Sequence, residues 1–397
     1  MTKTQLRRPN SMMILAVTGL ALAGLAVTVA AGVSVLAAVM ARSIVTPPKK
    51  RKEDIRVHIV DETAGTITLQ ATPDSVLPGE YSFWFSGDTG HARLGGILRS
   101  TPRTVVRKIV GVDFGDLAQA KRGRLSGWFY LGPEDLGLPF ENVLVQTGDG
   151  EAPAWLIPAE NASDRWVIQV HGRAVTRQET LRGVPVFREA GYTSLLVSYR
   201  NDGDAHASGD GRYGLGDTEW LDVEAAIAFA VGRGAKNIVL MGWSMGGAIV
   251  LQTATRAEYR DILVGIVLDS PVVDWTDVVA YQGDILGLPA PIASGAIEVM
   301  GQRWGGVLTG QASPIDFDRL DFVTRADELT VPILLMHSDD DGYVPSTGSR
   351  ALAMRRPDIV TFVPFSIARH TKLWNYDREG WNSAIRSWLG ELAPLVR

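Results

Sequence analysis

The segment of this chain that points most directly to chemistry is residues 242–246, which read Gly-Trp-Ser-Met-Gly. An apolar run, Asn237–Met241, precedes it and a helix-like run, Ala248–Gln252, follows it. A serine on a sharp turn between a strand and a helix has strained backbone, and glycines on either side leave room for the turn. The turn exposes the Ser244 hydroxyl and aims the first helix amides at the point where an oxyanion would form. The pattern therefore predicts a serine nucleophile that attacks acyl groups.

A serine nucleophile needs a base, and the base needs a carboxylate that orients it. After such a turn, the acid and then the histidine are expected along the chain, each on a loop that follows a strand. His370 follows the apolar run Val360–Val363 and is the last histidine of the chain, so it is the expected base. The acid is expected after Ile333–Met336, where residues 339–341 are all aspartates. Three successive carboxylates cannot all approach one imidazole, and spacing alone leaves the choice among them open.

The oxyanion would need two N–H donors. One is expected from the backbone of Met245, directly after the serine. The other is expected from the loop after Trp166–Val170, supplied by the backbone of Arg173 or of neighbouring Gly172. His171 in the same loop is expected to brace it rather than to transfer protons. Acyl transfer of this kind requires no metal and no organic cofactor, and the chain has no cysteine that could serve as a thiol nucleophile or a metal ligand.

From residue 165 onward, apolar runs alternate with helical segments, which predicts a doubly wound, mostly parallel α/β domain with its site at the carboxyl ends of the strands. Helices are expected at Gln178–Glu189 and Thr218–Val231. Residues 275–327 interrupt the alternation and are expected to form either a lid over the site or ordinary surface helices. The expected strands are Trp166–Val170, Ser194–Ser198, Ile238–Met241, Leu263–Leu268, Ile333–Met336 and Val360–Val363.

Ahead of this domain the pattern differs. Between residues 55 and 155, short alternating runs are broken by glycine, proline and aspartate, which is typical of antiparallel strands and hairpins. We expect a β-rich accessory domain over residues 53–140 and the α/β domain over residues 141–397. His58 and His91 stand alone in the accessory region and are expected to be structural or exposed.

The first 52 residues carry eight Lys/Arg and no Asp/Glu around an uncharged run from Met12 to Met40. As a helix at ~1.5 Å per residue this run exceeds the ~30 Å hydrocarbon core, so we expect a single-pass N-terminal transmembrane anchor with basic flanks. A cleaved signal peptide is the alternative, but its apolar region is usually only ~7–15 residues. Basic residues on both sides leave the side of the membrane open. The acidic remainder gives no footprint for nucleic acid, and no protein partner is indicated.

In these residues the sequence resembles the α/β-hydrolase superfamily over roughly residues 140–397. The residues of these motifs are also similar to those of the serine-aminopeptidase and prolyl-oligopeptidase-like branch, which includes membrane-anchored bacterial hydrolases with a domain ahead of the sheet. In relatives the acid is the aspartate three residues before Val-Pro, so the resemblance implies Asp341. The motifs that carry the likeness occur in order as His171-Gly172, Gly242 to Gly247, Asp341-Gly342-Tyr343-Val344-Pro345, and His370-Thr371 leading into Trp374-Asn375.

The expected function is hydrolysis of carboxylic esters, with a small-molecule or other acyl substrate, through Ser244, His370, Asp341 and an acyl-enzyme. A thioesterase or a peptidase on the same fold is the enzymatic alternative. A peptidase would need an acid to fix a peptide terminus, which Glu219 or Asp217 could supply. An inactive membrane-bound scaffold is the remaining alternative, and a complete triad argues against it.

Overall fold

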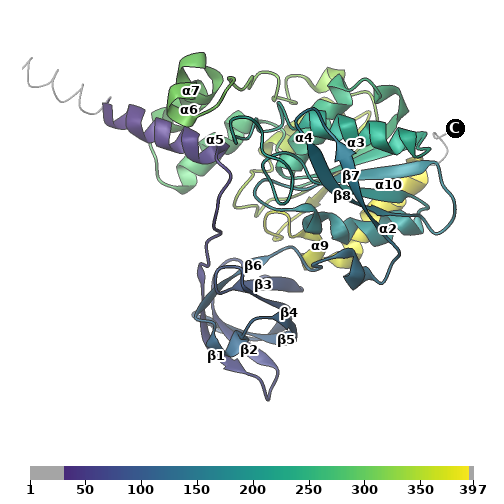
Figure 1. The fold of residues 1–397 in the computed structure, drawn as a ribbon. Coiled ribbons are helices and arrows are strands. Elements are labelled where there is room, and N and C mark those ends of the chain that lie inside the picture. Colours follow the sequence, from purple (N-terminus) through teal and green to yellow (C-terminus); the bar gives the residue numbers. More distant parts are fainter. Residues whose placement is uncertain (1–30, 393–397) are drawn as a thin grey trace, which may run out of the picture.

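The computed structural model describes residues 31–392 of the chain. They form a helical segment over residues 31–45, a small β-barrel and a larger α/β part (Figure 1). The expected transmembrane run, residues 12–40, lies mostly outside the described residues. Within residues 31–392, none of the helices combines the length and the apolar character that crossing a membrane would require.

The barrel closes in the strand order β1-β2-β5-β4-β3-β6, and each pair of neighbours is antiparallel. Closure depends on the pairing of β1 with β6, which sets Ile55 opposite Gly123. Gly123 is required there because a Cβ would lie 2.3 Å from the Phe83 ring. A closed sheet leaves no free edge for another chain to pair with. The strands are β1 (Ile55–Asp61), β2 (Thr66–Gln70), β3 (Tyr81–Phe85), β4 (Gly90–Ser100), β5 (Thr104–Phe114) and β6 (Arg122–Ser126).

The α/β part is built on a sheet of order β14-β13-β12-β11-β9-β10-β8-β7, parallel except for the antiparallel pairings of β7 and β8. The doubly wound fold expected from the sequence is confirmed, and the strands fall within a few residues of their predicted positions. They are β7 (Glu141–Gln146), β8 (Glu151–Ile157), β9 (Arg165–Val170), β10 (Thr193–Val197), β11 (Asn237–Trp243), β12 (Leu263–Asp269), β13 (Ile333–Ser338) and β14 (Val360–Phe365).

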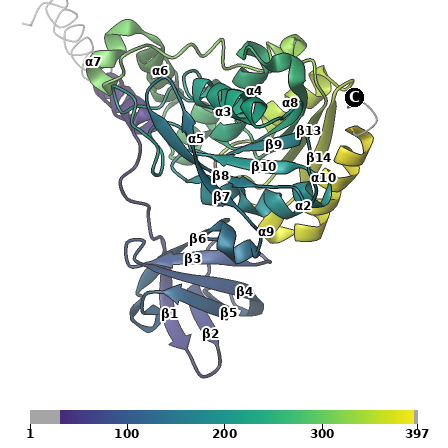
Figure 2. The same cartoon turned by 45° about the vertical axis from the view of Figure 1, so that its right-hand side comes forward.

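Helices cover both faces of this sheet, and alternate residues of each strand enter opposite cores (Figure 2). In β11, Ile238 and Leu240 face one core, whereas Val239 and Met241 face the other. This double burial explains the near-continuous apolar character of the strands. The first core includes residues of α3 (Trp220–Gly232) and α4 (Met245–Arg256); the second includes residues of α2 (Val184–Glu189) and α10 (Arg378–Leu392).

The prediction of one continuous helix over Gln178–Glu189 is partly wrong. Residues 177–183 form a 3₁₀ helix, and α2 begins only at Val184. Pro185 gives the physical reason, because it has no N–H to donate to the carbonyl of Leu181, so α-helical bonding cannot run across this point.

The insertion between β12 and β13 forms α5 (Trp275–Ile285), α6 (Ala290–Gly301) and α7 (Gly306–Thr309), which we call the cap helices. They gather around the helical segment 31–45 at one end of the molecule, away from β1 and β2 of the barrel (Figures 1 and 2). Ala37 packs closely on α6, since a Cβ at Gly295 would lie 3.0 Å from the Ala37 side chain. Arg42 donates from Nη1 to the carbonyl of Leu308 over 2.9 Å.

Candidate active site

Ser244 lies between β11 and α4 with φ 51° and ψ −120°, a strained conformation for a residue with a side chain. The glycines around it are sterically required. A Cβ at Gly242 would lie 2.4 Å from the carbonyl oxygen of Gly246, and one at Gly246 would lie 2.2 Å from that of Val170. The strained turn leaves the largely buried serine hydroxyl at the carboxyl edge of the sheet.

His370 and Asp341 lie on the loops that follow β14 and β13, and the structure brings both to Ser244. His370 Nε2 is 2.9 Å from Ser244 Oγ, and His370 Nδ1 is 2.7 Å from Asp341 Oδ2. Asp341 Oδ1 accepts the backbone N–H groups of Tyr343 and Val344 at 2.8 and 2.9 Å. These bonds fix the carboxylate, which in turn orients the imidazole with Nε2 toward the hydroxyl.

The neighbouring aspartates face elsewhere. Asp339 accepts hydrogen bonds from Arg350 and Ser346, and Asp340 lies 3.4 Å from Arg369 Nη1. Both are exposed, whereas the Asp341 side chain is fully buried. Among the three consecutive carboxylates, Asp341 is the one in contact with His370.

The surroundings of Asp341 and His370 shift the pKa values of the two groups in opposite directions. Burial would raise the pKa of Asp341, but the positive charge of His370 and hydrogen bonds from His337 and His370 outweigh it, so this pKa is well below its usual range. Burial would lower the pKa of His370, but the charge and hydrogen bond of Asp341, with Glu179 and Asp269 nearby, raise it overall. The carboxylate therefore stays ionised while the imidazole gains and loses its proton.

The loop after β9 lies against the serine, because a Cβ at Gly172 would be 3.1 Å from Ser244 Cβ. The N–H of Gly172 donates to Glu179 Oε2 over 2.8 Å, so it is not available to an oxyanion. Within the described residues, no protein group accepts the N–H of Arg173. Met245 is the first residue of α4, where an N–H has no acceptor inside the helix. Of the expected donors, Arg173 and Met245 thus remain.

His171 is fully buried in this loop, and its Nδ1 lies 2.8 Å from the carbonyl oxygen of Gly172. Its ring stacks on Tyr199 with the centroids 4.2 Å apart, and the Tyr199 hydroxyl donates to the same carbonyl over 2.7 Å. Burial lowers the pKa of His171 to about 3. A neutral ring that donates to Gly172 holds the loop, in agreement with the bracing role expected from the sequence.

Comparison with known proteins identifies the larger part of the chain. The model of the alpha/beta hydrolase family matches residues 166–379, more than half of the chain. The chain belongs to the alpha/beta hydrolase family. The predicted superfamily is thereby confirmed. The model of a domain of unknown function matches residues 56–126, which form the barrel.

The hydrolase fold also has solved relatives. Crystal structures of an esterase from Pyrococcus furiosus in space groups P2₁2₁2₁ and P2₁ each have a TM-score of 0.51. They are 19% and 20% identical in sequence, and each alignment covers 66% of this chain and 94% and 96% of the esterase, respectively. At this identity the likeness concerns the fold. None of the curated proteins compared with the chain matches it.

A buried network of charged and polar side chains lies next to the site, and the sequence did not predict it. Glu179, which holds Gly172, has its other oxygen 3.8 Å from Arg182. Arg182 donates from Nη1 to the carbonyl of Thr371 at 2.7 Å and to Asn375 Oδ1 at 2.9 Å. This network joins the loop after β9 to the loop that carries His370. Residues three apart in a run expected to be helical are usually an exposed pair, so the sequence carried no signal of this role.

The barrel contacts the same loops of the hydrolase domain. Lys372 Nζ is 2.9 Å from Asp74, and Asn375 Nδ2 donates to the carbonyl of Glu80 over 2.8 Å. Arg51, between the helical segment and the barrel, donates to the carbonyl of Ala174 over 2.8 Å and lies over the Trp128 ring. The accessory domain therefore contacts the segment after His370 directly and the loop after β9 through Arg51.

A second serine–histidine–aspartate row lies on the outer face of the barrel strands, opposite the barrel core that Phe83 and Ala92 line. His91 Nδ1 is 2.8 Å from Asp113, and its Nε2 is 2.8 Å from Ser82 Oγ. The expectation that His91 stands alone is therefore wrong, because its ring has two side-chain partners. Burial lowers its pKa, and His91 and Ser82 are both fully buried, so no substrate reaches them. The row has a structural role, as expected for this histidine.

One cavity in the described part of the protein lies apart from Ser244. This cavity, of about 320 Å³, lies beside α6, lined by Met300, Arg303 and residues 311–314 among others, and it contains none of the site residues. In the described part of the chain, no group of three or more His, Asp or Glu side chains is arranged to hold a metal ion.

Proposed function

We propose that the protein is a serine hydrolase that cleaves carboxylic esters through an acyl-enzyme. The hydrogen-bonded row of Ser244, His370 and Asp341 is the observation that supports this proposal. Ser244 Oγ attacks the acyl carbonyl while His370 Nε2 takes its proton, and Asp341 stabilises the imidazolium. His370 then protonates the leaving alcohol. In the second half of the reaction His370 takes a proton from water, which attacks the acyl-enzyme, and then returns that proton to Ser244 Oγ as the acid leaves.

The N–H groups of Met245 and Arg173 stabilise the oxyanion in this mechanism. Removing one such donor typically costs about 3 kcal/mol of transition-state stabilisation. The strained turn at Ser244 supports this assignment, because it puts the start of α4 beside the hydroxyl. The side chain of Arg173 has no part in the proposed chemistry.

A peptidase is less well supported. Glu219, which could have fixed a peptide terminus, is buried and accepts the backbone N–H groups of Gly214 and Gly216, both at 2.8 Å. Asp217 pairs with Arg256 and Arg319. Both acids hold their own surroundings together. A thioesterase would use the same three residues. An inactive scaffold would not require Ser244, His370 and Asp341 to be hydrogen-bonded in a row.

Labelling with a fluorophosphonate probe tests the nucleophile. Wild type should be labelled, Ser244→Ala should not, and Ser294→Ala, which removes an exposed hydroxyl from α6, should be labelled like wild type. Equal labelling of the first two proteins would reject the assignment. Turnover of p-nitrophenyl esters, a thioester and a peptide anilide by the purified full chain then identifies the bond class, and no turnover of any of them would favour the scaffold.

We also propose that residues 12–40 anchor the chain in a membrane. The uncharged character of this run and its basic flanks support the proposal. Extraction of membranes with carbonate and with detergent tests it, since an anchored chain is released by detergent alone.

A further inference from the structure

Apolar side chains are exposed where the cap helices meet the helical segment 31–45. Val307 of α7 is 89% exposed, and its neighbours of the same kind are also accessible. Arg42, which donates to the carbonyl of Leu308, ties the segment to α7. We call this surface the apolar edge; its members are Val35, Leu36, Val39, Ile285, Leu286, Trp304, Val307 and Leu308.

The outer face of the helical segment changes character along its length. Ala37, Met40, Ala41 and Val45 face the protein core and are buried. On the opposite face Val35, Leu36 and Val39 are exposed, whereas Arg42 and Ser43 occupy that face one turn later. A surface helix in water carries polar residues on its outer face. The exposed apolar residues instead continue an uncharged run that begins at Met12, which indicates a nonaqueous surrounding up to about Val39.

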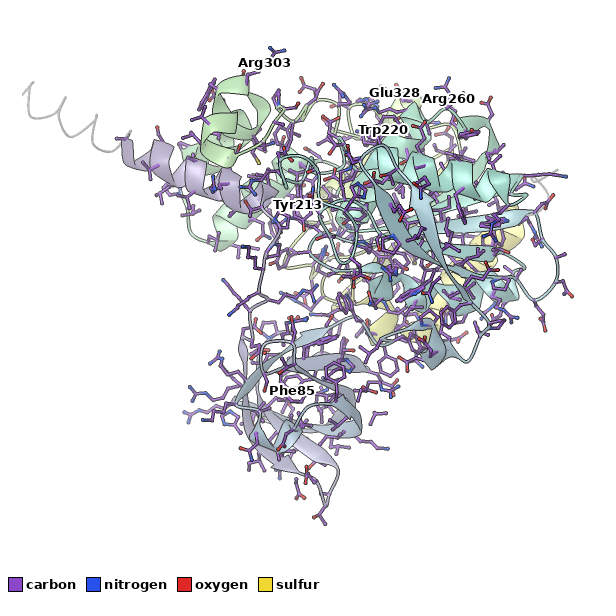
Figure 3. The ribbon with its side chains drawn as sticks, in the orientation of Figure 1. Phe85, Tyr213, Trp220, Arg260, Arg303 and Glu328 are labelled. Carbon is purple, nitrogen blue, oxygen red and sulfur yellow. The ribbon has the colours of Figure 1, made fainter. Side chains whose placement is uncertain are left out.

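Both signs of charge are exposed near the apolar edge: Asp284 precedes Ile285 and Glu298 lies on α6, but basic side chains are more numerous. Arg303, next to Trp304, lies at the tip of the cap and points away from the molecule (Figure 3). Arg42 is exposed at the polar end of the helical segment, and Lys49 and Lys50 follow it. Tryptophan and basic side chains at the rim of an apolar surface are typical of membrane interfaces. A second copy of the chain would instead bring the same cations together across a symmetric interface.

The elements that carry the apolar edge also contact loops of the proposed active site. Arg173 donates its side chain to the carbonyl oxygens of Ser43 and Ile44, each at 2.9 Å, so the end of the helical segment holds the oxyanion loop. On the other side, the Tyr281 hydroxyl of α5 donates to the carbonyl of Asp341 over 2.9 Å. The segment and the cap that carry the edge thus contact the loops beside Ser244.

We propose that the apolar edge rests in the headgroup region of an anionic bilayer and that the hydrolase draws bilayer-dissolved acyl esters into its site. The docking part stands on the exposed side chains and charges alone. The substrate class rests, in addition, on the proposed function. The cap is then a second attachment to the membrane beside residues 12–40, and it fixes how the catalytic domain stands on the surface.

A fluorescent label tests the docking, and the absence of cysteine in the chain makes a single labelled site simple to obtain. Val307→Cys and the control Met354→Cys, an exposed site on α8 (Thr347–Arg355), are labelled with an environment-sensitive dye in the full chain. Both are reconstituted in vesicles of phosphatidylcholine and phosphatidylglycerol. At position 307 the emission should shift to the blue and be quenched by lipids with a nitroxide near the headgroup, and at position 354 neither should occur. Equal behaviour of the two labels overturns the docking, as does quenching at position 307 by a second labelled copy without quenching by lipid.

Activity tests the substrate class. The variant Trp304→Ser/Val307→Ser/Leu308→Ser should lose most of its hydrolysis of a long-chain ester embedded in vesicles and keep that of soluble p-nitrophenyl acetate. Unchanged hydrolysis of both esters overturns the substrate class. Absence of acetate turnover by wild type would reject the proposed function instead, and the labelling result would still decide the docking.

Discussion

The buried pair of Glu179 and Arg182 permits a quantitative test of how the site is held. In Glu179→Gln the amide oxygen can still accept the N–H of Gly172, but Arg182 loses its nearest counter-charge. Breaking a buried ion pair by removing one partner costs roughly 3–5 kcal/mol. The separation of 3.8 Å and the charge of Asp269, which also acts on Arg182, place the loss at the lower end, about 3 kcal/mol.

For a domain of this size, 1 kcal/mol corresponds to roughly 2–4 °C in melting temperature, so Glu179→Gln should melt roughly 6–12 °C below wild type. Burial raises the pKa of Glu179, so calorimetry is done at mildly alkaline rather than neutral pH, because a higher pH favours the ionised carboxyl. The matched control is Glu189→Gln on α2, whose carboxylate is exposed and lies 3.2 Å from Arg386; it should change stability by less than ~1 kcal/mol. Equal melting temperatures of the two variants would refute the role given to the buried pair.

The remaining predictions concern the site itself. Asp341→Asn should lower kcat for p-nitrophenyl butyrate about 10⁴-fold with little change in KM, because His370 would be held in the wrong tautomer. The rate should rise with pH through a midpoint above the usual pKa of histidine, since His370 accepts a proton only when neutral and its pKa is raised; a midpoint below that value would contradict this. Gly246→Ala should lower the melting temperature strongly, because its Cβ would lie 2.2 Å from the carbonyl oxygen of Val170, whereas Gly96→Ala, with open space around it, should not.

The sequence predicted the parallel sheet well because its inner strands, β9 to β13, are buried on both faces and are almost continuously apolar. It did not predict closure of the barrel. The pairing of β1 with β6 joins Ile55 to Gly123 across the whole domain, and alternation within a strand shows which residues share a face but not which strand lies beside it. The same limit explains His91: the β4–β5 register, with His91 opposite Phe114, puts Asp113 within reach of its ring, and no local pattern encodes that register.

In the site, the residues found by sequence are those that a local motif or the order of elements marks. Ser244 needs its strained turn, His370 follows the last strand, and Asp341 was singled out among three aspartates by the resemblance to relatives. Glu179 and Arg182 carry no such mark, because only the packing of distant loops buries them. Gly172 shows the same limit, since its N–H was one of the possible oxyanion donors until the position of Glu179 excluded it.

The contacts of the accessory domain help to hold two residues with strained backbone that lie beside the site. Ala174, next to Arg173, has φ 61°, and Thr371, next to His370, has φ 51°. Such conformations cost of order 1–3 kcal/mol each and persist only where the surroundings impose them. The carbonyl of Ala174 is held by Arg51 and that of Thr371 by Arg182.

Arg51 and Arg182, which hold these two carbonyls, are themselves connected to the barrel. Arg51 lies over Trp128, two residues after the end of β6, and Arg182 reaches the barrel through Asn375, which donates to the carbonyl of Glu80. The barrel therefore stabilises the two loops that border Ser244 without placing a side chain in the row. Because a loop of strained backbone relaxes when its supports are removed, a hydrolase domain without the barrel would keep its sheet and its serine turn but lose the fixed positions of His370 and Arg173.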